Sequence, residues 1–323
     1  MSIRSMFLRT ALLCASVAAF PAHADWPERP IRVVVPYPAG AAGDLVLRQM
    51  LPALQARLGQ PVVVDNKAGA GGNIGVSDVV RSKPDGYTFV LGATNNFVIN
   101  QYLYKSLGFD PLQALQPVTR VADVPSVLFV NSTVPARSFR ELTDYARANP
   151  GKLNYGSPGN GTAPHLSAFA LSEFMGAEMT HVPYKGAQPG VAGLLGNEVQ
   201  MFLVGYGVAG AQLAGGRIRA LLVASNERLM PLPDVPTAAE AGLPDVIMSN
   251  WWGLAAPRGT DMAIVRRMAG EIRAIQAQPA TQQFLSAQGF VGSANTPEEF
   301  ARQLARDAVS WQTVVKRSGV TID

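Results

Sequence analysis

Cysteine and histidine are almost missing from this sequence of 323 residues, which contains one cysteine and three histidines. Metal sites built from Cys and His side chains need several of these residues, so the scarcity excludes a Cys/His metal cluster. Charged residues are also few, at 15% of the chain, whereas hydrophobic residues make up 48%. This balance excludes intrinsic disorder and supplies enough apolar side chains for a large core.

A concentrated basic segment is absent too. The chain has 27 Lys and Arg residues against 23 Asp and Glu residues, and the net charge of +4 is not gathered into a cluster. Nucleic acid is therefore not an expected partner. No apolar run of about eighteen residues follows the N-terminal region, so the mature protein is expected to be soluble. At roughly 100–200 residues per domain, the length indicates two domains.

The first 24 residues have the layout of a secretory signal peptide. Arg4 and Arg9 form a short basic region, residues 11–20 form an apolar region, and residues 22–24 (Ala-His-Ala) form a small-x-small cleavage site. Cleavage there starts the mature chain at Asp25. An ordinary N-terminal helix is the alternative interpretation.

The one cysteine, Cys14, lies inside this segment and follows Leu12 and Leu13 rather than the small residue that a lipoprotein signal needs. The mature chain is therefore expected to have no disulfide, no thiol nucleophile and no lipid anchor. A soluble, exported chain of this kind is most simply located in the periplasm.

The rest of the chain repeats one unit, an apolar strand followed by a glycine-rich turn and an amphipathic helix. Strands are expected at 31–35, 62–64, 88–91, 126–130, 153–156, 181–184, 199–204 and 218–223, and helices after Asp44 and at 73–81, 138–148, 163–175, 188–195, 262–276 and 297–316. Strand–helix–strand units form parallel sheets, so the predicted fold class is α/β. Two such lobes place strand ends and helix N-termini around a shared cleft, which favours a small anionic ligand.

The helix after the first strand has a regular pattern. Apolar side chains between residues 47 and 58 recur at helical spacing, which predicts one buried face. Asp44 is expected to cap its N-terminus and Gly59 to end it. Pro52 lies inside the pattern and is expected to kink the helix or to lower its stability.

Two strand–turn–helix loops are candidate anion sites, and the first contributes Tyr37, Ala39, Gly40, Ala41 and Asp44. Small residues let the backbone approach a ligand, and the free N–H groups of the first helical turn can receive a carboxylate. The spacing is neither G-x-G-x-x-G nor a P-loop, so no nucleotide cofactor is expected. A tight turn with a helix cap is the alternative interpretation.

The second loop has the same position in the second series and contributes Ser157, Asn160, Gly161 and Thr162, while Asn95 follows the third strand. Neither loop contains an arginine, so backbone N–H groups are expected to hold the ligand carboxylates. The alternative interpretations are an ordinary loop for the second segment and a helix cap or turn for Asn95.

Ser157 and His165 together raise the possibility of hydrolase chemistry. Ser157 does not lie in the G-x-S-x-G turn of such enzymes, and no carboxylate is placed to orient the histidine. A polar contact on the first turn of its helix is the alternative role for His165. His181 is expected to be structural, and Lys185 is expected to meet an anion or else to remain solvated.

Several motifs extend these loops over nearly all of residues 26–323. They are V-P-Y-P-A-G-x-x-x-D (35–44), D-N-K-A-G-A-G-G-N-I-G (65–75), P-D-G-Y-T (84–88), S-L-G-F-D-P (106–111), K-L-N-Y-G-S-P-G-N-G-T (152–162), H-V-P-Y-K-G (181–186), L-P-D-V-P-T-A-A-E-A-G (232–242) and W-W-G-L-A-A-P (251–257). In this order and spacing they resemble the solute receptors of tripartite tricarboxylate transporters, called Bug receptors.

The resemblance implies a type II periplasmic-binding-protein fold, with two α/β lobes and a ligand cleft between them. It assigns residues 26–125 and 250–323 to lobe 1 and residues 126–249 to lobe 2. It also implies a small organic acid as ligand, carboxylate contacts from the two loops, and a membrane permease as partner. A monomer is expected.

The sequence departs from the family pattern at Val204, where the family often has an aspartate, and at Ala41, Ala42 and Gly43, where a hydroxyl residue is common. A valine at the cleft cannot pair with an ammonium group, so a ligand without an amino group is predicted. The alternative is that Val204 only packs the sheet.

The preferred interpretation is a periplasmic receptor that delivers an organic acid to a permease and is not an enzyme. The alternatives are an exported hydrolase that uses Ser157 and His165, and a sensory adaptor that docks on a signalling partner.

Overall fold

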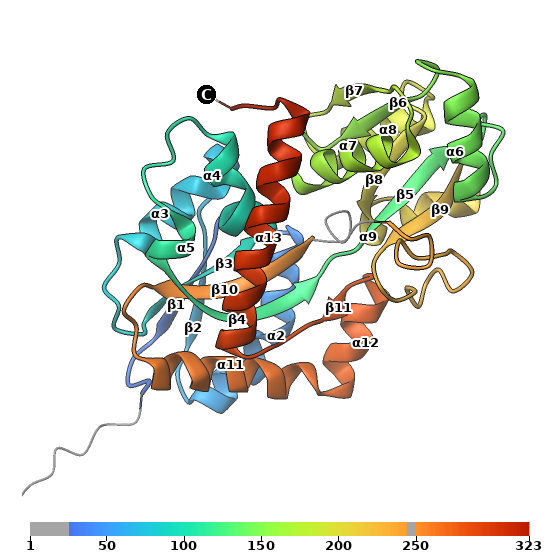
Figure 1. Cartoon of the computed structure of the whole chain (residues 1–323). Helices are drawn as coiled ribbons and strands as arrows, with labels where there is room; N and C mark the ends of the chain where they lie inside the picture. Colours follow the sequence, from blue (N-terminus) through green and yellow to red (C-terminus); the bar gives the residue numbers. More distant parts are fainter. Residues whose placement is uncertain (1–25, 244–249, 323) are drawn as a thin grey trace, which may run out of the picture.

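The computed structural model describes residues 26–243 and 250–322, so the expected signal peptide (1–24) lies outside the described residues. The described chain forms two lobes, each built on its own β-sheet with helices packed against it (Figure 1). This arrangement confirms the predicted two-lobed α/β class.

The sheet of lobe 1 has six strands in the order β11-β4-β10-β3-β1-β2. The strands are β1 (Ile31–Val35), β2 (Val62–Asn66), β3 (Thr88–Ala93), β4 (Leu115–Asp123), β10 (Trp251–Pro257) and β11 (Val291–Gly292). β1 pairs in parallel with β2 and β3, as predicted, but β10 runs antiparallel to both β3 and β4. The strand–helix–strand pattern predicted the parallel part of this sheet but not β10, which the chain inserts between β3 and β4 when it returns from lobe 2.

The sheet of lobe 2 has five strands in the order β7-β6-β8-β5-β9. They are β5 (Ser126–Asn131), β6 (Asn154–Ser157), β7 (Thr180–Pro183), β8 (Met201–Gly205) and β9 (Ile218–Ala224). β6 pairs in parallel with β7 and β8, whereas β5 is antiparallel to β8 and β9. The parallel strands end beside the second candidate loop.

Helices cover both sheets. Lobe 1 carries α2 (Ala42–Leu58), η1 (Ala70–Gly72), α3 (Asn73–Val80), η2 (Asn95–Ile99), α4 (Asn100–Leu103), α5 (Pro111–Ala114), α11 (Met262–Gln276), α12 (Pro279–Ala287) and α13 (Pro297–Ser318), and lobe 2 carries α6 (Phe139–Ala148), α7 (Ala163–Met175), α8 (Ala187–Leu195), α9 (Tyr206–Ala209) and η3 (Gly210–Gly215). α7 and α11 have the predicted bounds, and most other predicted helices differ by one or two residues at an end.

Helix α2 corrects one expectation about the first loop. Ala41, not Asp44, is the N-cap residue, and it makes no side-chain capping bond, because the helix starts before the aspartate. Pro52 does not end the helix, which continues to Leu58; the proline is exposed, so the carbonyl that it leaves unbonded can face water. Gly59 ends the helix with φ of 69°, as predicted.

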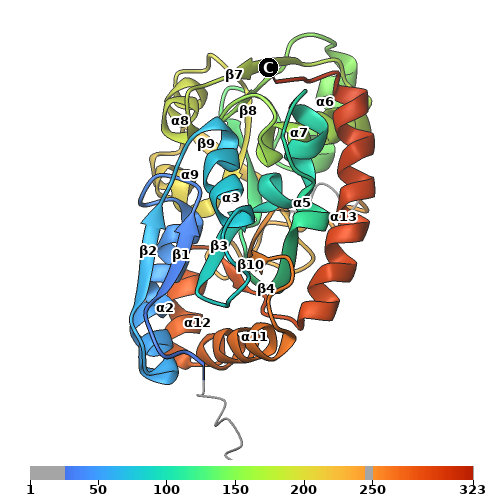
Figure 2. The same cartoon turned by 90° about the vertical axis from the view of Figure 1, so that its left-hand side faces the viewer.

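The chain passes between the lobes in two segments, here called the crossings: one lies between β4 and β5, and the other leads into β10. Helix α13 also ties the two lobes together. α13 runs alongside β4 and continues to α7 of lobe 2 (Figures 1 and 2). Near its end, Arg317 forms an ion pair of 2.9 Å with Glu173 of α7. One apolar cluster includes Trp311 and Val315 of α13 together with Leu171 of α7, so the cores of the two lobes are continuous.

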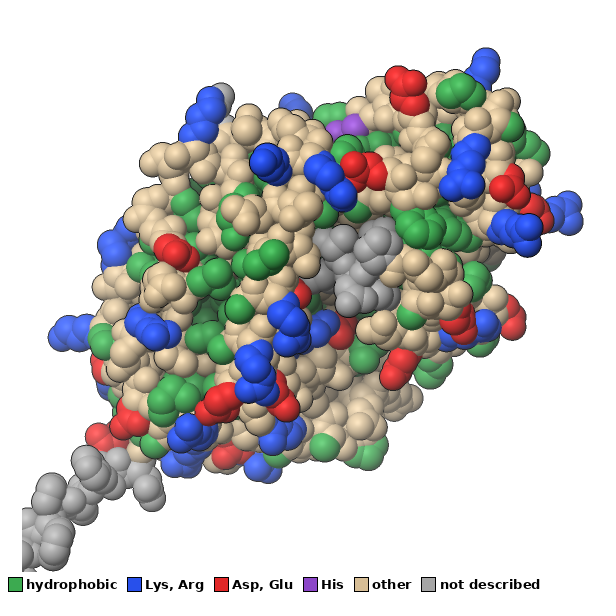
Figure 3. All heavy atoms as spheres, in the orientation of Figure 1, with side chains coloured by type: hydrophobic (Ala, Val, Ile, Leu, Met, Phe, Trp, Pro, Cys, Tyr) green, Lys and Arg blue, Asp and Glu red, His purple; other side chains and the backbone are tan. Residues whose placement is uncertain are grey.

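The surface carries interspersed charges. In Figure 3, acidic and basic side chains alternate over the visible face, and neither sign gathers into an expanse there. Within residues 26–243 and 250–322, no helix combines the length and the apolar character needed to cross a membrane.

Candidate ligand-binding site

A cavity of about 230 Å³ lies where the loops of the two lobes meet. Lobe 1 lines it with Tyr37, Gly71, Ala93, Asn95, Asn100, Leu103, Tyr104, Asn250, Trp252 and Ile322, and lobe 2 lines it with Pro158, Asn160, Gly161, Thr162 and Pro164. None of these described residues carries a formal charge. The lining therefore offers aromatic and aliphatic surface with a few neutral polar groups, which is typical of small-molecule sites.

The cavity brings together five of the predicted site residues, namely Tyr37, Asn95, Asn160, Gly161 and Thr162. The other eight lie outside its lining. Ala39, Gly40 and Lys185 are exposed, and Ala41 is the N-cap residue of α2. The remaining four are buried, namely Asp44, Ser157, His165 and Val204. The first loop thus reaches the cavity through Tyr37 rather than through its tip.

Tyr37 and Trp252 form the aromatic wall of the cavity. Their rings meet edge to face with centroids 5.1 Å apart. Burial raises the pKa of Tyr37 above its ordinary value, so its hydroxyl stays protonated and can donate a hydrogen bond. A Cβ atom at Gly43 would lie 2.0 Å from Trp252 Cε3, so glycine is required where α2 passes this wall.

Asp44 orders the first loop from behind. Its carboxylate is 1% exposed and accepts hydrogen bonds from Gly40 N at 2.9 Å, Arg48 Nε at 2.9 Å and Asn66 Nδ2 at 3.0 Å. Burial alone would raise its pKa, but the hydrogen bonds from Arg48, Gly40 and Asn66 hold the pKa below its usual value. Asp44 therefore remains ionised, with its charge balanced by Arg48.

Asn95 joins the two lobes directly across the cleft. Its Nδ2 donates to Gly161 O at 2.8 Å, and its Oδ1 accepts from Ala163 N at 3.0 Å. The N–H group of Gly161 donates to His165 Nδ1 at 3.0 Å. The N–H groups of Gly161 and Ala163 were expected to be free for a ligand carboxylate, but both already donate to acceptors of the protein.

A stack of rings supports the second loop. The rings of His165 and His181 lie 3.7 Å apart and nearly parallel, and Tyr155 stacks on His181 with centroids 5.0 Å apart. Burial, and for His165 also the neighbouring His181, lowers the pKa of each histidine to about 4. Both rings are therefore neutral at neutral pH, as His165 Nδ1 must be to accept the bond from Gly161.

The serine–histidine pair differs from the one expected. Ser157 Oγ lies 2.7 Å from His181 Nε2, whereas His165 contacts Gly161, so the partner named from the sequence is wrong. Residue spacing alone pointed to His165, but the parallel pairing of β6 and β7 places Ser157 beside His181. Ser157 is fully buried, and among the described residues no carboxylate bonds to either histidine, so the orienting acid of a hydrolase triad is not found there.

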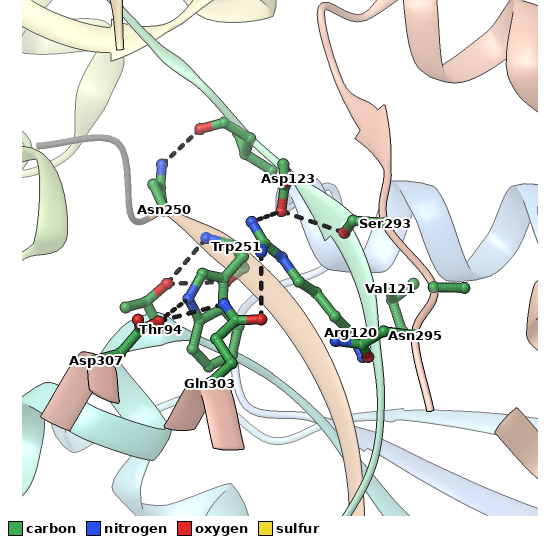
Figure 4. A network of polar contacts seen from close by, with 12 residues as sticks. Thr94, Arg120, Val121, Asp123, Asn250, Trp251, Ser293, Asn295, Gln303 and Asp307 are labelled. Carbon is green, nitrogen blue, oxygen red and sulfur yellow. Dashed lines mark hydrogen bonds and ion pairs between the residues drawn. The ribbon is translucent and has the colours of Figure 1, made fainter. Parts of the chain in front are cut away.

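The two chain crossings are bonded to each other at the edge of the cavity. Asn250 Nδ2 donates to Val124 O at 2.8 Å, and Val124 N donates to Asn250 O at 2.9 Å. Next to this pair, Trp251 N donates to Thr94 Oγ1 at 2.9 Å (Figure 4). Trp251 Nε1 donates to Asp307 of α13 at 2.9 Å, so one network links both crossings, the cavity and α13.

Several lining residues carried no signal in the sequence. Leu103, Tyr104 and Ile322 belong to no strand–turn–helix loop, and Trp252 lies in a motif to which no ligand contact was assigned. Their position in the cavity depends on contacts between segments that are far apart in the chain.

Two α/β lobes, joined by paired crossings and enclosing a small cavity at their junction, define a bilobal solute-binding receptor. The family model described as "Tripartite tricarboxylate transporter family receptor" matches residues 46–320. The chain therefore belongs to this family of receptors, as the motifs of the loops predict.

Individual relatives agree with this assignment. Protein BugT of Bordetella pertussis is 33% identical over 323 residues, covering 100% of this chain and 98% of BugT. The structure of R. palustris Rpa4515 with adipate has a TM-score of 0.79 and 33% identity, covering 92% of this chain and 99% of that chain. MatC from Rhodopseudomonas palustris with bound malate has a TM-score of 0.74 and 29% identity, covering 90% of this chain and 100% of that chain.

Proposed function

We propose that this protein is a periplasmic receptor that encloses a small organic acid between its lobes and delivers it to the permease subunits of a tripartite transporter. The observation that carries the proposal is the uncharged cavity between the two loops, combined with membership of the receptor family. The adipate and malate in the two related structures support a carboxylate as the ligand class.

Neutral donors hold the carboxylate. Helix α2 begins without a side-chain cap behind Tyr37, and its dipole favours a negative charge on that side of the cavity. The hydroxyl of Tyr37, kept protonated by burial, and the carboxamide of Asn160 add donors within the cavity. No arginine or lysine among the described lining residues competes with them.

The ligand lacks an amino group. An ammonium in the cavity would have no carboxylate side chain among the described lining residues to pair with, and burying an unpaired charge costs several kcal/mol. Val204 does not contribute to this exclusion of an ammonium group, because it is 4% exposed and packs in an apolar cluster with Val127. The packing interpretation of Val204 is therefore preferred.

We also propose how the chain is processed, how many copies act together, and where the lobes begin and end. Residues 1–24 are removed, the mature chain acts as a monomer, and the lobes comprise 26–125 with 250–323 and 126–249, in line with the division of strands between the two sheets. The protein catalyses no reaction. The hydrolase and adaptor alternatives gain no support from the geometry of Ser157 or from the family.

Calorimetry with matched acids tests the proposal. Succinate is compared with aspartate, and benzoate with phenylalanine, on protein freed of co-purified ligand by unfolding and refolding. At least one acid without an amino group should bind, and it should bind more tightly than its amino acid counterpart. Tighter binding of the amino acids, or hydrolysis of carboxylic esters that is lost in Ser157→Ala, would contradict it.

A further inference from the structure

The segment after α13 returns to the cavity and pairs with lobe 1. Ile322 N donates to Leu103 O at 2.8 Å, and Lys105 N donates to Ile322 O at 3.4 Å. Tyr104 and Ile322 form a parallel β-bridge. The backbone of Ile322 is thus fixed against residues 103–105.

Leu103 and Ile322, here called the Leu103–Ile322 pair, both lie at the cavity, where Ile322 is half-buried and Leu103 behind it is 1% exposed. They also meet the second loop of lobe 2. A Cβ atom at Gly161 would lie 2.6 Å from Leu103 Cδ1 and 3.0 Å from Ile322 Cδ1, and Gly161 has φ of +71°. Glycine is therefore required for the loop backbone to rest on this pair, which forms an apolar face shared by the two lobes.

Three asparagine carboxamides of the cavity already donate to the protein. The Asn95 carboxamide is engaged by Gly161 and Ala163. The Nδ2 of Asn100 donates to Gly71 O at 3.2 Å and to Asn73 Oδ1 at 2.6 Å. The Nδ2 of Asn250 donates to Val124 O. A hydroxyl on the body of a ligand would therefore find these three amide nitrogens engaged, and the Tyr37 hydroxyl and Asn160 carboxamide are assigned to the ligand carboxylate.

We propose that the Leu103–Ile322 pair is a specificity determinant that selects acids with an unsubstituted hydrocarbon body over acids hydroxylated along the body. The inference rests on the proposed function and names a narrower ligand class for the same cavity. A methylene chain gains by covering the part of the Ile322 side chain that is still exposed. A hydroxyl placed against them loses its bonds to water without replacement.

Two pairs of acids that differ by one hydroxyl test the inference by calorimetry: succinate against malate, and adipate against 2-hydroxyadipate. The wild-type protein should bind the unsubstituted member at least about tenfold more tightly. Ile322→Thr, which adds a hydroxyl to the face, should reduce that ratio about fivefold. Ile322→Leu should keep the ratio, and so should the control Ile74→Thr, because Ile74 is half exposed on α3 and does not line the cavity.

The outcomes separate this inference from the proposed function. A wild-type preference for the hydroxylated acids, or a ratio unchanged in Ile322→Thr while binding persists, overturns the specificity role and leaves the receptor proposal intact. Absence of binding for all four acids overturns the inference, and the receptor proposal is overturned only if benzoate also fails to bind. Circular dichroism of each variant verifies that a lost affinity does not reflect a lost fold.

Discussion

At the scale of single residues, Asn95 is the side chain that most directly couples the lobes. Its carboxamide makes both interlobe hydrogen bonds at the cavity, to Gly161 O and from Ala163 N. We expect Asn95→Ala to weaken acid binding by about 1–3 kcal/mol, or roughly five- to 150-fold in Kd. Calorimetry measures the change. Asn149→Ala, which removes a hydrogen bond to Tyr145 inside lobe 2, is the control and should leave Kd unchanged.

The buried histidines predict a pH dependence of folding stability. The pKa values of His165 and His181 are about 4 in the folded protein and return to about 6.5 on unfolding. Between these values the unfolded chain binds more protons, so this contribution to stability is complete above pH 6.5 and is lost as the pH falls toward 4.

Urea midpoints at pH 7 and pH 4.5 measure this effect. His165→Gln removes one titrating ring and should make the fall in stability on acidification shallower than in the wild type. An equal fall in both proteins would show that His165 does not contribute.

The residues of the site were only partly predictable. Tyr37, Asn160, Gly161 and Thr162 follow strand ends in the strand–turn–helix pattern, and sheet geometry alone directs such loops to a cleft. Leu103 and the partner of Ser157 were not predictable in this way, because chain pairing and not sequence spacing sets their neighbours.

At the scale of elements, β4 and β10 account for the largest error in the expected fold. β10 is buried along its whole length in lobe 1, but no strand was expected from the sequence at residues 251–257. No local pattern indicates that a strand will insert antiparallel into a sheet formed from a distant segment. Helix α11 is amphipathic and carries its own periodicity, whereas α7 is buried on most sides and its bounds are marked by the capping residue Thr162 and by Gly176, whose φ is 62°.

Helix α2 gives a prediction at this scale. A Cβ atom at Gly43 would overlap the Trp252 ring, so Gly43→Ala should push α2 away from the cavity wall, lower stability by about 1–3 kcal/mol, and weaken acid binding. Gly270→Ala in α11 is the matched control, because nothing lies within 4 Å of its added Cβ. That change should stabilise the protein by about 0.5–1 kcal/mol. Urea denaturation of both variants gives the comparison, and equal effects would refute the packing role of Gly43.

At the scale of the whole molecule, two crossings permit a hinge motion while the bonds between Asn250 and Val124 keep the crossings together. The two hydrogen bonds of Asn95 hold the loops of the two lobes together at the cavity. We expect small-angle scattering to give a smaller radius of gyration when the acid saturates ligand-free protein. A scattering profile unchanged by saturating acid would argue against hinge closure.

The central claim is that neutral groups in an uncharged cleft hold a carboxylate. A crystal structure of the protein with the tightest-binding acid from the calorimetric panel tests it most directly. We expect a carboxylate in the cavity between the lobes, bonded to neutral lining groups such as the Tyr37 hydroxyl and the Asn160 carboxamide. A carboxylate paired instead with Arg48 or Lys185, with these neutral groups unused, would contradict it.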